Sequence, residues 1–165
     1  MTFSLNSTKK VQEIEEAIYI LHQFINQIHK TSSSERNKLV VILHCLDHLT
    51  RLTKVLRDHK KLNEILAQEI LTQDWYEVLT ELNELIKNRE QLLNVSLLLE
   101  QTSQNMAEER KNQRDLYFVN LIDNNLQVKT TMTKVESLLW LDGLIYHMWR
   151  SSARLSELQN MKNEK

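Results

Sequence analysis

The chain has 165 residues and a formal net charge of -1, because 21 Lys and Arg residues are balanced by 22 Asp and Glu residues. This balance excludes the broad positive surface that attracts nucleic acid or an anionic membrane. Proline is absent and there is 1 glycine, so the residues that β-hairpins and tight turns need are almost missing. The composition therefore predicts one all-α domain over residues 1–165, without a glycine-rich loop for a phosphate group or a dinucleotide.

Two amphipathic helices are expected at the start of the chain. Residues 9–30 place apolar side chains at alternating steps of three and four, which is the spacing of one helix face. These side chains are Val11, Ile14, Ile18, Leu21, Ile25 and Ile28. Ser32, followed three residues later by Glu35, fits the capping box that opens a second helix, which is expected to end near 57–61. The short link between the two helices predicts that they are antiparallel neighbours.

The middle of the chain is expected to hold a short helix and then a long one. The short helix covers residues 62–71. Asp74 and Glu77 form a second capping box, after which the helical pattern continues from about residue 75 to residue 124. A turn is expected over residues 123–129, where two adjacent asparagines interrupt the pattern.

The last helix is expected to begin at Thr130, or at Thr133, where Glu136 completes a third capping box. Its apolar stripe comprises Leu138, Leu141, Ile145, Met148, Ser152 and Leu155. Gly143 lies inside this pattern at a cost of about 1 kcal/mol relative to alanine, which predicts close contact with a neighbouring helix. Asp142 borders the stripe and is expected to accept a hydrogen bond or an ion pair from a neighbouring helix.

The second helix and the last helix resemble each other when the sequence is laid over itself at the offset that matches two Leu-Asp pairs. The pairs are Leu46-Asp47 and Leu141-Asp142. Each half then reads as helix, polar turn, helix, which predicts a pseudo-repeat of residues 9–60 and 104–160 joined by a long central helix. In such a repeat Asp47 also accepts a bond from a neighbouring helix. Chance alignment of leucine-rich helices is the alternative, because the two aspartates are the only polar identities.

The last helix also carries a recognisable pattern within LLWLDGLIYHMWRSSARL, made of Trp140, Leu141, Asp142, His147 and Arg150. This pattern resembles the closing helix of PhoU-like domains, especially those in the cytosolic C-terminal region of bacterial sodium/phosphate cotransporters. The segment CLDHLTRL, with Asp47 and Arg51, is similar to the corresponding helix of the first half. The resemblance implies an antiparallel helical bundle built from two similar hairpins, a PhoU-like tandem repeat, with these residues at family-pattern or interaction positions. Leu139 and Gly143 depart from the pattern, which usually has arginines there.

What the resemblance implies for function is a non-enzymatic regulatory or interaction domain of a phosphate transport system. Its partner would be a membrane transporter or a second copy of the chain, with no nucleic acid and no direct insertion into the membrane. Cys45, the single cysteine, lies among apolar neighbours, which predicts a buried thiol and a reducing, cytoplasmic location. A transporter would hold the domain at the inner membrane. The alternative is a structural helical oligomerisation module of unrelated function, favoured by the long leucine-rich helices.

Catalytic and cofactor-binding residues in recognisable spacing are not found, so no enzymatic activity and no cofactor are expected. His44 and His48 share one helix face with Asp47 between them, close to a zinc-peptidase signature in which glutamate takes the place of the aspartate. A metal-dependent protein built on these three residues is the weakest hypothesis, since a further ligand is not evident. An ion pair between Asp47 and Arg51, four residues apart, is the favoured interpretation of the segment.

Overall fold

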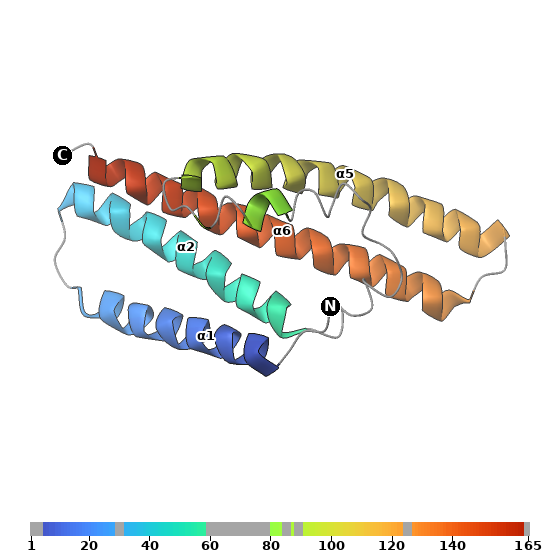
Figure 1. The fold of residues 1–165 in the computed structure, drawn as a ribbon, viewed down its shortest axis with the longest axis horizontal. Helices are drawn as coiled ribbons and strands as arrows, with labels where there is room; N and C mark the ends of the chain where they lie inside the picture. Colours follow the sequence, from blue (N-terminus) through green and yellow to red (C-terminus); the bar gives the residue numbers. More distant parts are fainter. Residues whose placement is uncertain are drawn as a thin grey trace.

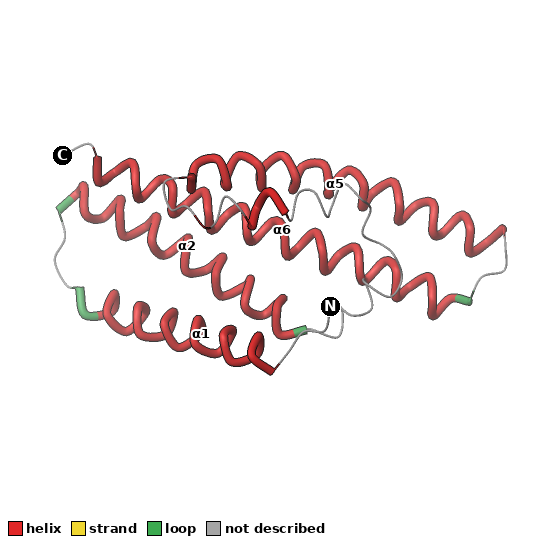
Figure 2. Tube along the Cα trace, viewed as in Figure 1, coloured by secondary structure: helices red, strands yellow, loops and turns green. Residues whose placement is uncertain are grey.

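The computed structural model describes residues 5–28, 32–58, 80–83, 87, 91–123 and 127–163. All regular secondary structure in these residues is helical (Figure 2). The labelled helices are α1 (Leu5–Asn26), α2 (Ser33–Arg57), α5 (Leu92–Asp123) and α6 (Val128–Asn163). The predicted all-α bundle is therefore confirmed for this part of the chain. The helix expected over 62–71 and the capping box expected at Asp74 and Glu77 lie outside the described residues.

Helix α6 is the helix that joins the bundle together. It packs against α5 along one side and against α2 along the other, and α1 packs against α2 (Figure 1). The contacts between α2 and α6 pair His48 with His147 and Val55 with Trp140, so the two helices run antiparallel. The α5–α6 hairpin also extends well beyond the α1–α2 hairpin at the end where α5 leads into α6 (Figure 1).

The core lies mainly between α5 and α6. One cluster of buried side chains consists of Met106, Leu138, Leu141 and Ile145, and a second consists of Leu82, Val95 and Leu99. Each such side chain contributes about 1.5–3 kcal/mol when it leaves water. The stripe expected on the last helix is thus confirmed in its centre, whereas Leu155 at its end is 41% exposed.

Serines and threonines are also buried in α5 and α6. Ser137 is 0% exposed, and its hydroxyl donates to the carbonyl of Thr133 one turn earlier. The Thr102 hydroxyl of α5 likewise donates to the carbonyl of Leu98, one turn earlier. These bonds within one helix satisfy the hydroxyls without a partner across the interface, so small polar residues can replace apolar ones there.

Gly143 does not mark a close approach between helices, as the sequence had suggested. A Cβ atom built at this position would meet no atom of the described part of the chain within 4 Å. The prediction of a close contact at Gly143 is therefore wrong, and the glycine costs helix stability with no packing gain from a neighbouring helix.

The helix ends follow local sequence signals at one site and depart from them at another. At the start of α2, Ser32 and Glu35 form the expected capping box, with the Ser32 amide donating to Glu35 Oε2 at 2.7 Å. Helix α2 ends at Arg57, as expected. The capping box expected at Thr133 is wrong, because α6 begins earlier, at Val128, and the Thr133 hydroxyl donates to the Lys129 carbonyl inside the helix.

Only one edge of the apolar stripe on α1 is covered. Val11 and Ile18 are each 6% exposed, while Ile14 and Leu21, on the neighbouring flank of the stripe, are 44% and 46% exposed. The reason is that α2 is the helix against which α1 packs among the described elements, and one neighbour covers a narrow band of a helix surface. Within the described residues, no helix carries an apolar stretch long enough to cross a lipid bilayer.

Candidate functional site

A group of titratable and aromatic side chains lies where α2 packs against α6. Its centre is a contact between two histidines, with Nδ1 of His48 3.2 Å from Nδ1 of His147. Tyr146 contacts both imidazole rings, with ring centroids 5.8 Å from His48 and 5.2 Å from His147 and steep angles between the rings. We call these three residues, together with Asp47, Arg51 and Arg150, the histidine cluster.

The two imidazoles of the cluster point at each other head-on. Their centroids are 5.5 Å apart, which is about the largest separation that two imidazole rings can have when their nearest nitrogens are 3.2 Å apart. The N–H direction of one Nδ1 atom therefore lies along the lone pair of the other, as in an N–H···N hydrogen bond. Two imidazoles that bind one tetrahedral ion would instead turn toward a shared point, which brings their centroids closer together.

Both imidazoles are poor bases in this setting. Burial lowers the pKa of His48 below its ordinary value of 6.5, and the neighbouring His147 and Arg150 lower that pKa further. Burial also lowers the pKa of His147 from 6.5, and Arg51 adds to the effect. Asp47 opposes both shifts with its negative charge. At neutral pH the pair is therefore mainly uncharged, and one ring keeps the Nδ1 lone pair that accepts the hydrogen bond.

Arg150 lies at the edge of the cluster, with its guanidinium group packed against an aromatic ring and partly buried. Its guanidinium carbon is 5.2 Å from the centroid of the Trp149 ring, so the cation rests on an aromatic face. Its Nε atom is buried and has no hydrogen-bond partner among the residues that the structure describes. A cation held in this way keeps a positive charge near His48.

The candidate metal residues of the sequence do not assemble. His44 is exposed, His48 faces His147, and Asp47 is bound to Arg51, with Arg51 Nε 3.0 Å from Asp47 Oδ2. Among the residues that the structure describes, no three His, Cys, Asp or Glu side chains are gathered so that they could hold a metal ion. The ion pair expected between Asp47 and Arg51 is confirmed. The expectation that Asp47 binds a neighbouring helix is wrong, since its partner is one turn away on the same helix.

Asp142 does have its partner on a neighbouring helix, as expected. Nη1 of Arg110 on α5 lies 3.2 Å from Oδ2 of Asp142 on α6, and the Asp142 side chain is 18% exposed. Burial raises the pKa of Asp142 from 3.8, and Arg110 lowers it by less than burial raises it. The ion pair therefore offsets only part of the cost of removing the carboxylate from water.

Trp140, another residue of the family-like pattern, fastens α6 to the end of α2. Its Nε1–H donates to the carbonyl of Val55 at 3.0 Å. Val55 lies in the last turn of α2, where carbonyl groups have no partner within the helix, and the amide of Asp58 is the other donor to the same oxygen. The indole therefore caps α2 from a different helix.

Cys45 is buried, as predicted, and lies in the same junction one turn from His48. Its side chain is 4% exposed, and its thiol donates to the carbonyl of Ser151 on α6 with Sγ and O 3.8 Å apart. Burial raises the pKa of the thiol above 9.0. The thiol is therefore protonated and shielded while α2 remains packed against α6.

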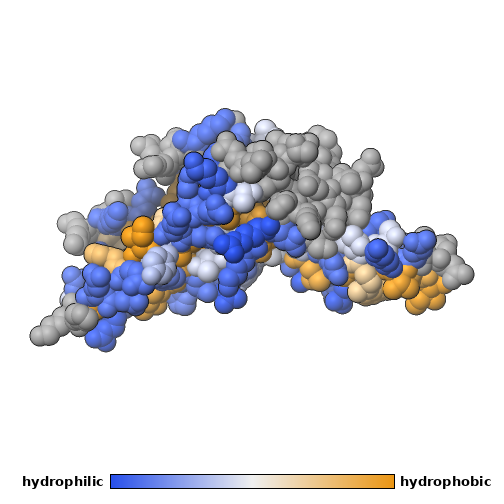
Figure 3. Space-filling model, turned by 90° about the horizontal axis from the view of Figure 1, so that it is seen from below, coloured by the Kyte–Doolittle hydropathy of each residue, from blue (hydrophilic) through white to orange (hydrophobic). Residues whose placement is uncertain are grey.

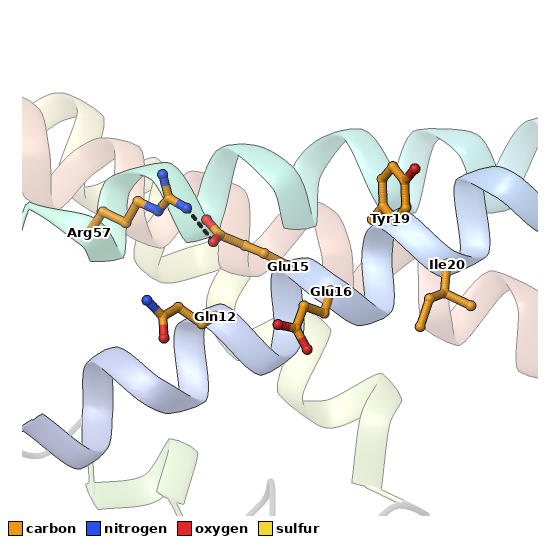
Figure 4. A pocket seen from close by; sticks show the side chains of 6 residues that line it. All are labelled: Gln12, Glu15, Glu16, Tyr19, Ile20 and Arg57. Atoms are coloured by element: carbon orange, nitrogen blue, oxygen red, sulfur yellow. Dashed lines mark hydrogen bonds and ion pairs between the residues drawn. The ribbon is translucent and has the colours of Figure 1, made fainter.

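A second surface feature is an open groove of about 720 Å³ on α1 (Figure 4). Glu15 points from α1 to Arg57 at the end of α2 and forms an ion pair with it (Figure 4). The rest of the groove is lined by Gln12, Glu16, Tyr19 and Ile20. Because Arg57 balances the charge of Glu15, Glu16 supplies the net negative charge of the groove. Tyr19 and Ile20, which are 63% and 65% exposed, supply its apolar surface.

No family model, curated protein or solved structure matches the chain. The fold and the contacts described above define an all-α helical-bundle protein in which α2 and α5 both pack against α6. The pattern residues occupy its junctions: Trp140, His147 and Arg150 lie against α2, and Asp142 lies against α5.

The contact between His48 and His147 is the feature that the sequence did not reveal. The two residues are 99 positions apart, and no periodic pattern relates them. His147 had been noted as a pattern residue and His48 as a neighbour of His44, each within its own helix. The antiparallel register of α2 and α6 brings them together, and such a register depends on packing across the whole interface.

Proposed function

We propose that this chain is a non-enzymatic helical interaction domain that resembles the PhoU-like part of a phosphate transport system. The observation that carries the proposal is an exposed apolar row on α1, which we call the α1 seam. It consists of Ile14, Ala17, Leu21 and Phe24, all exposed, with Phe24 at 63%. Steps of three, four and three residues are those with which one helix packs along another. The α1 seam is therefore shaped to receive a helix.

The α1 seam and the groove of Figure 4 lie on different flanks of α1, so Glu15 and Glu16 in the groove do not border the seam. A helix with an apolar stripe would match the seam. Apolar side chains also interrupt the hydrophilic surface on the face shown in Figure 3. An exposed apolar area of this kind is typical of binding surfaces.

The PhoU-like character of the domain is supported by the order in which the helices pack. Each of α2 and α6 packs against the helix that forms a hairpin with it, and α2 and α6 pack against each other. A tandem repeat of two hairpins would give this order. The partner would then be a membrane transporter, of the sodium/phosphate cotransporter kind, that presents a helix on its cytosolic side.

The test is co-purification of the chain with a sodium/phosphate cotransporter, together with phosphate uptake after deletion of the chain. The double variant Leu21→Glu/Phe24→Glu places two charges in the α1 seam and is expected to lose the transporter and to change uptake as the deletion does. Gln23→Glu adds a charge to an exposed position of α1 outside the seam and is the matched control. Unchanged uptake after deletion, together with no transporter contact, would exclude the proposal.

A structural oligomerisation module is the second candidate, and a different observation favours it. Large apolar side chains are exposed at the protruding end of the α5–α6 hairpin: Leu116, Val119, Ile122, Val128 and Met132. Two copies could cover these side chains by packing end to end. Light scattering distinguishes the candidates, because an oligomer that dissociates in an Ile122→Glu variant supports this one. A monomer at every accessible concentration rules it out.

A further inference from the structure

The junction between the two hairpins contains a contact whose strength depends on proton number. We propose that His48 and His147 form a proton-sensitive clasp, which holds α2 against α6 with up to one added proton and releases it when both rings are charged. The inference rests on the head-on contact of the two Nδ1 atoms at 3.2 Å and on its place between α2 and α6. It does not depend on the proposed function.

The proton count follows from the geometry. In the neutral pair, one ring carries its proton on Nδ1 and donates it, and the other ring carries its proton on Nε2 and accepts with Nδ1. A first added proton binds Nε2 of the donor ring, which leaves the N–H···N bond intact and assists it with charge. A second added proton can bind only Nδ1 of the acceptor ring. It removes the lone pair that holds the bond and sets two N–H groups against each other.

The charges around the clasp make the second proton still less favourable. Arg51 of α2 and Arg150 of α6 lower the pKa of His48, and Arg51 also lowers the pKa of His147. Asp47 is the opposing charge, and it is already bound to Arg51. Tyr146 meets both rings through its aromatic ring. The pair therefore titrates as one unit with two proton-binding steps.

The direction of the pH response follows from the lowered pKa values. A native imidazole with a pKa below 6.5 binds fewer protons than the same group in the unfolded chain. The contribution of the clasp is therefore complete above the unfolded pKa of 6.5 and is lost as the pH falls through the lower native values. Acid should detach the α1–α2 hairpin from the α5–α6 hairpin, because contacts between the hairpins lie mainly between α2 and α6.

Cys45 offers a direct readout, since its thiol is buried between the same two helices and the sequence has 1 cysteine. The probe is 4,4′-dithiodipyridine, which reacts with thiols in acid as well as at neutral pH. The labelling rate of the native protein is divided by the rate in urea-unfolded protein at the same pH, which removes the pH dependence of the reagent and the thiol. This ratio is expected to rise about tenfold or more between about pH 7.5 and about pH 5.

Two variants and one control make the test specific. His147→Gln and, separately, His48→Gln replace one ring with an amide that can still bond to the other ring without a second titration. Each is expected to flatten the pH dependence of labelling while far-UV circular dichroism at neutral pH stays that of the wild type. His44→Gln changes an exposed histidine one turn away on α2 and should behave as the wild type. If the labelling ratio of the wild type does not change with pH, or if the Gln variants that fold change in parallel with it, the clasp is overturned.

Discussion

Arg110 of α5 and Asp142 of α6 form an ion pair of 3.2 Å in the middle of the interface between the two longest described helices. Asp142 lies beside Leu141, a member of the main core cluster. The pair therefore fixes the register of α5 on α6 at one polar position within an apolar contact. The pair stabilises the fold only by the amount by which the attraction between Arg110 and Asp142 exceeds the cost of removing the carboxylate from water.

Replacement of Asp142 by alanine should lower the free energy of unfolding by about 1–3 kcal/mol, because Arg110 loses its acceptor in a partly buried place. Asp142→Asn should lose less, since it keeps the shape and an acceptor oxygen but drops the charge whose burial raises the pKa. Urea denaturation measures both values. Glu108→Ala, at an exposed position of α5, is the control and should change the free energy by less than about 0.5 kcal/mol. Equal losses for Asp142→Ala and Glu108→Ala would mean that the ion pair contributes nothing.

The Asp142 carboxyl should also give the protein a small pH dependence in the acid range. Its native pKa is raised above 3.8, so its contribution to stability is present below the unfolded pKa and is lost as the pH rises through the native pKa. Asp142→Asn should remove this loss of stability with rising pH, because asparagine does not titrate. Carbon-detected NMR titration of the side chain checks the direction, and a native pKa below 3.8 would show that Arg110 outweighs burial.

Gly143→Ala should stabilise the protein. The position is inside α6, and the new methyl group would meet none of the described residues within 4 Å. The gain is therefore that of alanine over glycine in a helix, about 1 kcal/mol. Thermal unfolding should show a rise of about 2–4 °C for a chain of this size. A fall in the unfolding temperature would reveal a neighbour that fills this space.

Ser32→Ala should cost about 1 kcal/mol, because it removes the acceptor for the Glu35 amide at the start of α2. Ser33→Ala is a matched control, since Ser33 is exposed and is the first residue of the helix rather than its cap. Chemical denaturation of the two variants compares them directly. Similar losses in both would show that the capping box does not contribute to stability.

Trp140→Phe should loosen the last turn of α2. It removes the indole N–H that donates to the Val55 carbonyl but keeps an aromatic ring, so the loss should be near the usual 0.5–1.5 kcal/mol of one hydrogen bond, about 1 kcal/mol. Amide hydrogen exchange at Asp58, which donates to the same carbonyl, should speed up more than exchange in the first turn of α2. Unchanged exchange at Asp58 would mean that the indole does not hold this helix end.

Local signals in the sequence predicted local structure well. The all-helical content, the Ser32 cap, the end of α2 near Arg57 and the buried centre of the α6 stripe follow from composition, capping chemistry and periodicity. Each of these depends on residues within a few turns of one another. The ion pair of Asp47 with Arg51 belongs to the same class, since four residues along a helix suffice to define it.

Features that depend on packing between helices were harder to predict. Gly143 and Asp47 were both expected to meet a neighbouring helix, and neither does so, because the sequence does not specify which flank of a stripe a neighbour will cover. The same reason explains the exposure of Ile14 and Leu21 on α1. The sequence singled out individual residues of the histidine cluster. It did not predict their contact, because the contact depends on the register of α2 against α6.

The dependence of both hairpins on α6 has a consequence for how the chain folds. The contacts of α2 join residues such as His48 to partners 99 positions later, so they form only after most of the chain is available. Because closing so long a loop is slow, the docking of α2 on α6 is expected to be the slow final step of folding. Each hairpin can form earlier. During synthesis the α1–α2 hairpin would leave the ribosome well before its partner surface and would wait with its α6-facing side open to water. A chaperone that shields apolar helices could act on this intermediate.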